Sequence, residues 1–157
     1  LDEGMQSLAE VIKKTTGKDI TNYPGAGAAG GMGGGLLAFF NAELKPGTEL
    51  LLKAIDFSEK IKGADLIITG EGKADRQTAM GKAPYGILKE AQKEHIPVIV
   101  LAGNIENLPE LNKAGFKGIF SIAPGPITLE KAMEPEFAKE NITRLVSQLY
   151  SVITSFG

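Results

Sequence analysis

The chain has 157 residues, 43% of them hydrophobic and 23% charged, and its net charge of -2 gives no reason to expect nucleic acid or an anionic membrane as a partner. Because it has no cysteine, disulfides and thiolate chemistry are excluded, and a zinc site would depend on carboxylates and one histidine. No apolar run approaches membrane-spanning length, and the first residues show no signal-peptide pattern. These features predict a cytoplasmic protein of one domain, or a piece of a larger one that begins upstream of Leu1.

Residues 1–16 predict an amphipathic helix, because apolar residues recur at helical spacing and Gly17 follows the last turn. The next segment, residues 24–35, holds seven glycines in twelve positions and leads into the apolar run 36–40. A glycine-rich turn before a helix presents backbone N–H groups to an anion, and it also allows two helices to pack closely. Both interpretations stay open, and the first makes four glycines candidates for phosphate or substrate binding: Gly25, Gly27, Gly30 and Gly31.

The surroundings of this segment do not support a dinucleotide site. Residues 25–30 match the pattern G-x-G-x-x-G, but that pattern indicates dinucleotide binding only directly after a strand. Here polar residues ending in Pro24 precede it, and the acidic residues about 20 positions later, Glu43 and Glu49, fall beside predicted helices. We therefore do not expect a nicotinamide cofactor.

The central feature of the sequence is a strand, a polar loop and a helix within residues 64–94. Residues 65–69 form a short β-branched run that predicts a buried parallel strand ended by Gly70. The helix is expected to begin at about Ala83, with Pro84 in its first turn. Ligands of open α/β sheets bind beyond the carboxyl ends of the strands, so the loop between these elements is the first place to look for chemistry.

This loop is denser in functional groups than a solvated connection requires. Between glycines it carries carboxylates, cations, an amide and a hydroxyl: Glu71, Lys73, Asp75, Arg76, Gln77, Thr78 and Lys82. We favour a ligand site over a plain surface loop, because binding residues concentrate on loops held by a rigid scaffold. It is not a phosphate loop of the G-x-x-x-x-G-K-[ST] type, since neither of its Gly-Lys pairs has the required upstream glycine and following hydroxyl.

The rest of the chain alternates helices and strands. Apolar periodicity predicts a helix that follows the turn at 45–47 and ends at Ile55, with Leu50, Leu51, Ala54 and Ile55 facing inward, and then a short helical turn through Ile61. Strands are predicted at 97–102 and 118–122. Further helices are predicted at 83–94, 108–114, 129–133 and 135–154. Thr128 is a good N-cap for the short helix that follows it. The single histidine, His95, ends a helix and is interpreted as a capping or surface residue.

This order of elements predicts an α/β fold of Rossmann-like type, with a parallel sheet flanked by helices and right-handed crossovers. Three strands are few for so much helix, so the sheet is expected to continue in segments outside this chain. No G-x-S-x-G elbow supports a serine hydrolase.

Two stretches resemble the bacterial glycerate kinase family. They are Pro-Gly-Ala-Gly-Ala-Ala-Gly-Gly-Met-Gly at 24–33 and Gly-Glu-Gly-Lys-x-Asp-x-Gln-Thr-x-x-Gly-Lys-x-Pro at 70–84. Residues 97–103 and 120–132 look like the same family in the same order, so the resemblance runs from about Leu1 to Tyr150. Relatives commonly carry arginine where this chain has Lys73. Lysine keeps the positive charge, but it cannot form the two parallel hydrogen bonds that a guanidinium group donates to a carboxylate or phosphate.

The resemblance implies a two-domain α/β enzyme that transfers the γ-phosphate of ATP to a hydroxyl of D-glycerate with Mg²⁺, in a cleft between its domains. It also implies that residues 1–157 are the C-terminal portion of such an enzyme, whose missing N-terminal portion would act as a partner. A homo-oligomer stays open. The alternatives are a non-catalytic α/β binding domain, a fragment that needs a partner segment, and a phosphosugar-binding domain.

Phosphoryl transfer requires positioning, neutralised phosphate charge and a carboxylate near the attacking hydroxyl. We expect Asp75 to orient or deprotonate the glycerate hydroxyl or to hold Mg²⁺, with Glu71 as the second carboxylate and second candidate ligand of the metal. Positive side chains are expected to bind phosphate or the glycerate carboxylate, and polar ones to bind substrate hydroxyls. The first group is Lys73, Arg76 and Lys82, and the second is Gln77 and Thr78.

Overall fold

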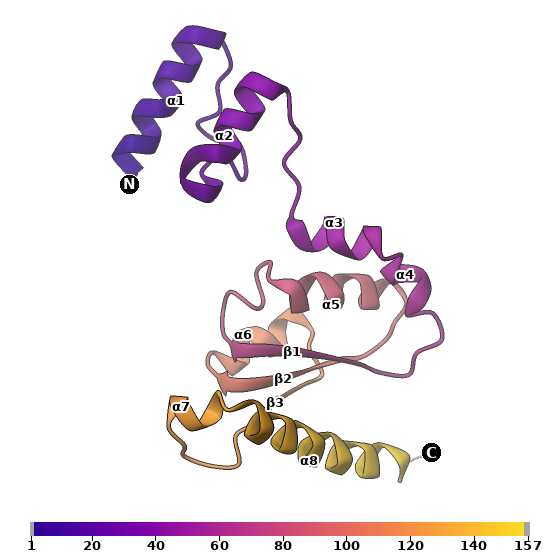
Figure 1. Cartoon of the computed structure of the whole chain (residues 1–157). Coiled ribbons are helices and arrows are strands. Elements are labelled where there is room, and N and C mark those ends of the chain that lie inside the picture. Colours follow the sequence, from indigo (N-terminus) through magenta and orange to yellow (C-terminus); the bar gives the residue numbers. More distant parts are fainter. Residues whose placement is uncertain (1, 156–157) are drawn as a thin grey trace. The chain divides into compact units, whose positions relative to one another are not determined.

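A computed structural model of the chain describes residues 2–155 and divides into two compact units, Leu1–Leu50 and Leu51–Gly157 (Figure 1). Leu1, expected at the start of the first helix, lies outside the described residues. No helix in the described part is long and apolar enough to cross a membrane.

The first unit contains α1 (Asp2–Thr16) and α2 (Ala28–Phe40), which pack against each other. Their shared core is small and contains Ala9 and Ile12 of α1, Ile20 of the connection, and Ala38 of α2. The first turn of α2 is irregular, because Ala29, Gly30 and Gly31 have positive φ angles. The regular part of the helix follows these residues, so the glycine-rich segment forms both a turn and part of the helix.

The second unit is built on a parallel sheet in the order β1-β2-β3, which confirms the predicted α/β fold. Its strands are β1 (Ile67–Ala74), β2 (Val98–Ile105) and β3 (Gly118–Ser121). Its helices are α4 (Phe57–Lys60), α5 (Ala83–Lys93), α6 (Leu108–Ala114), α7 (Leu129–Ala132) and α8 (Pro135–Thr154). The helix α3 (Gly47–Ala54) contains the boundary between the two units.

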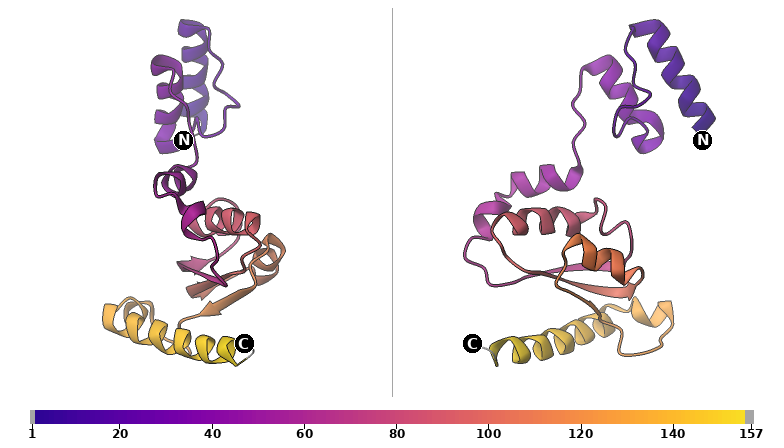
Figure 2. Two further views of the ribbon diagram at one scale, coloured as in Figure 1. Left: turned by 90° about the vertical axis from the view of Figure 1, so that its right-hand side faces the viewer. Right: turned by 180° about the vertical axis from the view of Figure 1, so that it is seen from behind.

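The sheet of the second unit has different covers on its two faces. The helices α5 and α6 lie on one face and α8 lies on the other (Figure 2). The main core lies on the first face, where Val98, Val100 and Ala102 of β2 contact Leu88 of α5 and Leu111 of α6. Alternate β2 residues face opposite ways, so Ile99 and Leu101 are buried on the α8 side. Burial on both faces explains the continuous apolar sequence of β2.

Two predicted strand limits are wrong. The strand β1 does not end at Gly70 but continues to Ala74, and β2 continues beyond Gly103 to Ile105. The two strands extend together, because the pairing of Lys73 with Asn104 and of Ala74 with Ile105 supplies backbone hydrogen bonds that outweigh the weak strand preference of glycine. As a result, Glu71 and Lys73 lie on a strand and not in a flexible loop.

The prediction for α3 is also wrong in part. The helix exists, but none of its residues is buried, and Leu50, Leu51 and Ile55 are exposed. The apolar residues of this segment predict a face turned toward a core. That core is not present among the described residues.

Candidate functional site

Three of the predicted site residues meet at the carboxyl end of β1. The ammonium nitrogen of Lys82 lies 3.4 Å from Oδ1 of Asp75 and 4.0 Å from Oε2 of Glu71. Glu71 lies on β1, Asp75 directly follows that strand, and Lys82 is the N-cap residue of α5. All three side chains are at least two-thirds buried, so solvent screens this cluster less than it screens a surface ion pair.

Asp75 is held in a tight turn. Its Oδ1 accepts hydrogen bonds from the backbone N–H groups of Gln77 at 2.9 Å and Thr78 at 3.3 Å. Partial burial acts to raise the pKa of Asp75, but these N–H groups and Lys82 outweigh it and hold that pKa below its ordinary value. Asp75 is therefore a fixed carboxylate that stays ionised at neutral pH.

Thr78 serves this turn instead of facing a ligand. Its side chain is fully buried, and its hydroxyl accepts a hydrogen bond from the N–H of Asp75 at 3.1 Å and lies 3.5 Å from the carbonyl oxygen of Lys73. The expectation that the Thr78 hydroxyl binds substrate therefore does not fit its contacts. Arg76 and Gln77 lie on the exposed side of the same turn, and their side chains make no hydrogen bond or ion pair within residues 2–155.

Lys73 does not join this cluster. Its ammonium nitrogen lies 2.9 Å from Oε1 of Glu106, which follows the end of β2, and this carboxylate raises the pKa of Lys73. Glu106 was not among the residues predicted for the site. Its position just beyond β2 could have indicated a site residue, because the carboxyl ends of β1 and β2 lie at the same edge of the sheet.

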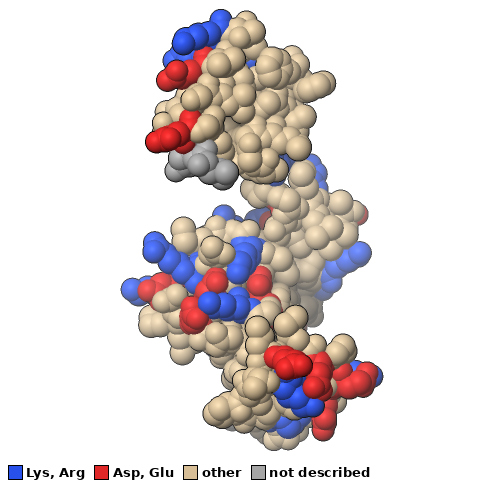
Figure 3. Space-filling model, turned by 60° about the vertical axis from the view of Figure 1, so that its left-hand side comes forward, with Lys and Arg blue, Asp and Glu red and all other residues tan. Residues whose placement is uncertain are grey.

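A crevice of about 980 Å³ lies at the carboxyl ends of the three strands. Glu71 and Lys73 of β1 line it together with Asn104 of β2, Ser121 of β3 and the loop that leads to α7. Figure 3 brings the left-hand side of Figure 1 forward and shows positive and negative side chains interspersed on the second unit. Asn104 and Ser121 were missed because each is a single polar residue after an apolar run.

The crevice has a charged side and an apolar side. Glu71 and Lys73 mark the charged side, and Ile127, Leu129 and Met133 expose apolar surface on the other. A crevice at the carboxyl end of a parallel sheet is a common ligand site, and this one offers both charged and apolar surface to a small molecule.

The described residues contain no group of three acidic or histidine side chains placed to hold a metal ion. The two carboxylates beside Lys82 still fit Mg²⁺, because this ion commonly takes one or two protein carboxylates and completes its shell with water and phosphate oxygens. Glu71 and Asp75 are the residues that would hold it.

The glycine-rich segment has its own environment in the first unit. The N–H groups of Ala26, Ala28, Gly31 and Gly34 donate to backbone carbonyl oxygens, so they do not face an anion. A Cβ on Gly33 would overlap the backbone carbonyl oxygen of Gly25, and a Cβ on Gly34 would lie 2.5 Å from Cδ1 of Ile20, so this part of the segment is closely packed. These contacts favour close packing over an anion site for this part of the segment.

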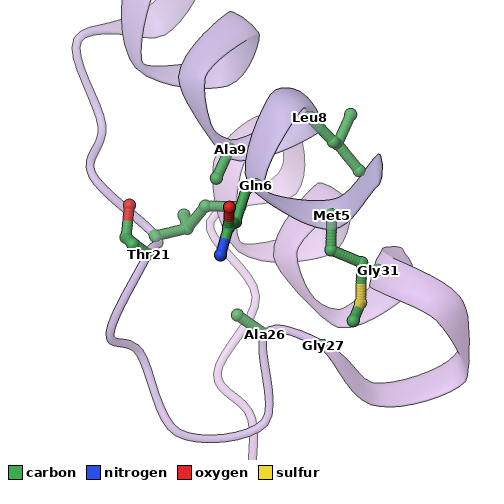
Figure 4. A pocket seen from close by; sticks show the side chains of 9 residues that line it. Met5, Gln6, Leu8, Ala9, Thr21, Ala26, Gly27 and Gly31 are labelled. Atoms are coloured by element: carbon green, nitrogen blue, oxygen red, sulfur yellow. The ribbon is translucent and has the colours of Figure 1, made fainter. Parts of the chain in front are cut away.

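Two of the four candidate glycines of this segment line a cavity. A cavity of about 190 Å³ lies between α1 and the segment and is lined by Gly27 and Gly31 but not by Gly25 or Gly30 (Figure 4). Its other walls are largely apolar, with Met5, Leu8 and Ala9 contributed by α1. No positive side chain of the described residues lines this cavity, so its described walls do not have the chemistry of a phosphate site.

Comparison with known proteins identifies the family. A sequence model described as "Glycerate kinase family" matches residues 1–154. The chain belongs to the glycerate kinase family. This finding confirms the resemblance carried by the motifs at 24–33 and 70–84.

Several glycerate kinases are similar to this chain. The identity is 44% to a glycerate kinase of Halalkalibacterium halodurans over 85% of this chain, and 42% to one of Bacillus cereus over 97% of it. A crystal structure assigned as a glycerate kinase 2 from Salmonella typhimurium LT2 has a TM-score of 0.64 and 33% identity, over 95% of this chain and 39% of that one. The chain spans 36% of the first relative and 40% of the second, and it corresponds to the C-terminal portion of such proteins.

Proposed function

We propose that this chain is the C-terminal portion of an ATP-dependent D-glycerate kinase, in which a glycerate hydroxyl attacks the γ-phosphorus of ATP and ADP leaves. The observation that supports it most is the cluster of Glu71, Asp75 and Lys82 at the carboxyl end of β1, in a chain of the glycerate kinase family. Of these residues, Glu71 also lines the crevice. Kinases need little covalent chemistry from the protein, so a fixed carboxylate beside a cation matches the requirement.

Asp75 is the group we assign to the glycerate hydroxyl. Since its pKa is held below the ordinary value, it is a weak base, and it would act by orienting the hydroxyl and accepting its proton late in the transfer. The neighbouring Lys82 would offset negative charge on the transferring phosphoryl group. Mg²⁺, when bound by Glu71 or Asp75 and by phosphate oxygens, would neutralise further phosphate charge.

Other predicted residues receive more limited roles in the proposal. Arg76 and Gln77 are exposed beside Asp75 and are available to the glycerate carboxylate or to phosphate. Lys73 would bind a phosphate only after exchanging its contact with Glu106. Gly25, Gly27, Gly30 and Gly31 remain predictions as phosphate-binding residues, and their contacts within the first unit do not strengthen that role. A cytoplasmic location belongs to the same proposal, because ATP is the expected phosphate donor.

The test measures ADP formation with ATP and Mg²⁺ by this chain co-produced with the part of the Bacillus cereus relative that precedes the match. We expect ADP only when D-glycerate is added and none with ribose 5-phosphate. A formed complex that binds ATP and glycerate but yields no glycerate-dependent ADP would contradict the kinase and favour the non-catalytic binding domain. Turnover or binding with the sugar phosphate alone would favour the phosphosugar-binding alternative.

A further inference from the structure

The crevice at the carboxyl ends of the strands has an apolar wall that the proposed phosphoryl transfer does not use. The side chains that expose this apolar surface are Ile127, Leu129 and Met133, which are 36%, 75% and 73% exposed. Single exposed apolar residues are common on protein surfaces. Three of them within a stretch of seven residues that lines one crevice form a patch, and such a patch suits an apolar ligand.

The helix α7 holds this wall in place. Thr128 caps the helix by accepting a hydrogen bond from the N–H of Lys131, and α7 contacts α8. The ammonium nitrogen of Lys131 lies 5.0 Å from the centre of the Phe137 ring of α8, which stabilises one side of α7 against that helix. Leu129 and Met133 are four residues apart, so they lie on the same side of the helical turn. The wall is therefore a surface that the fold positions, and not a loose loop.

The charged and apolar sides of the crevice belong to opposite edges of the sheet. Glu71 and Lys73 lie on β1, whereas the three apolar residues of the wall follow β3, the strand at the other edge. Neighbouring strands are about 4.8 Å apart, so β1 and β3 are separated by about 10 Å. A single ligand that contacts both sides must therefore be elongated, with one end suited to charge and the other end apolar.

We propose that the wall formed by Ile127, Leu129 and Met133 binds the purine base of the nucleoside triphosphate. The inference rests on the proposed kinase function, because that function places the transferring phosphoryl group at the cluster on β1 and so sets the direction of the ligand. The triphosphate then lies on the charged side, and the base, which is the flat and least polar part of the nucleotide, reaches α7. Asn104 of β2 lies between the two sides, since its Cα pairs in register with that of Lys73. Its amide group can donate to and accept from the ribose hydroxyls.

The test compares the binding of ATP with that of inorganic triphosphate, which has the phosphate chain but no base. The protein is this chain co-produced with the preceding portion of the Bacillus cereus glycerate kinase, and we expect it to bind ATP about tenfold or more tightly than triphosphate. Leu129→Gln should weaken ATP binding by about five- to tenfold and leave triphosphate binding unchanged, because only the apolar contact with the base is lost. The matched control is Val152→Gln on α8, since Val152 is 57% exposed and does not line the crevice. We expect it to change neither affinity.

Equal affinities for ATP and triphosphate would overturn the proposal, as would a complete lack of ATP binding or equal losses in the two variants. A Leu129→Gln chain that no longer forms the complex, while Val152→Gln still forms it, would show that the preceding portion covers the wall, and would also overturn the proposal. The kinase and the base site can fail separately. Glycerate-dependent ADP formation with a KM for ATP that Leu129→Gln leaves unchanged would retain the kinase and overturn the base site. ATP binding that Leu129→Gln weakens, without glycerate-dependent ADP, would retain the base site and contradict the kinase.

A second measurement keeps the proposal testable if the two polypeptides do not associate. The preceding portion is joined directly to Leu1 in one chain, which is irradiated with an ATP analogue that carries a photoreactive azido group on its purine ring. We expect the label in the tryptic peptides 118–131 or 132–139, which contain the residues of the wall, and we expect excess ATP to prevent it. Labelling confined to other peptides, or labelling that ATP does not prevent, would overturn the proposal.

Discussion

The substitution Gly33→Ala tests whether the glycine-rich segment is built for close packing. An ideal Cβ at Gly33 would overlap the carbonyl oxygen of Gly25 and lie 3.2 Å from Cδ1 of Leu44 and 3.3 Å from the carbonyl oxygen of Ala26. Overpacking of this kind costs about 1–3 kcal/mol, and the backbone oxygen cannot rotate aside as a side chain does. The better helix propensity of alanine stabilises the helix by about 1 kcal/mol and offsets part of this cost. We therefore expect a net destabilisation of up to about 2 kcal/mol.

The matched control is Gly35→Ala in the same helix. No atom lies within 4 Å of an ideal Cβ at Gly35, so the methyl group meets only open space. The substitution should stabilise the chain by about 0.5–1 kcal/mol, since the helix gains propensity without a clash. The two alanine variants are thus expected to change stability in opposite directions, although they lie only two residues apart.

Urea unfolding followed by far-ultraviolet circular dichroism measures both changes. Because the chain contains two compact units, the amide hydrogen exchange of α2 is measured in parallel, so that the first unit is followed by itself. If Gly33→Ala proves as stable as the unchanged chain, the steric argument fails. The glycines would then need another explanation, and backbone contact with an anion would be the first to consider.

Four further predictions concern the turn at Asp75 and the ion pair between Lys73 and Glu106. Thr78→Val should speed hydrogen exchange of the Asp75 amide at least tenfold because its buried acceptor is lost, whereas Thr78→Ser should keep that amide protected. The Asp75 carboxyl should titrate below its ordinary value of 3.8 by NMR, so its stabilising contribution is complete above that pH and is lost as the pH falls toward the folded-state pKa. Lys82→Met should raise this pKa, because one of the groups that lower it is removed, and an unchanged pKa would argue against the ion pair. Glu106→Gln should bring the raised pKa of Lys73 back toward its ordinary value, and a pKa that stays raised would show another cause.

The helices of the second unit could be read from the sequence because local signals agree with the final structure. The predicted start at Ala83 with Pro84 in the first turn, and the span 135–154 of the last helix, match α5 and α8. Thr128 caps α7 as expected, since its hydroxyl accepts a hydrogen bond from the N–H of Lys131. Capping residues and apolar periodicity act within a few residues, so a single sequence is enough to find them.

The details of the site depend on contacts between distant residues. Local preference predicted that β1 would end at Gly70, but pairing with β2 carries it through Glu71 and Lys73. Thr78 looked like a ligand residue because its sequence neighbours are polar, and only the fold shows that its side chain is buried. The partner of Lys73 lies more than thirty positions away at Glu106, a distance over which no sequence spacing gives guidance.

The most direct test of the proposed kinase is Asp75→Asn in the complex of this chain with the preceding portion of the Bacillus cereus relative. Asparagine keeps an oxygen for the turn at Asp75 but removes the negative charge and the proton acceptor. Asp65→Asn is the control, because Asp65 is an exposed carboxylate before β1. We expect Asp75→Asn to lower the rate of glycerate-dependent ADP formation by about 10²–10⁴-fold and Asp65→Asn to leave it unchanged. Turnover by the Asp75→Asn complex within a few-fold of the unchanged complex would contradict the assignment of Asp75 as the central acid.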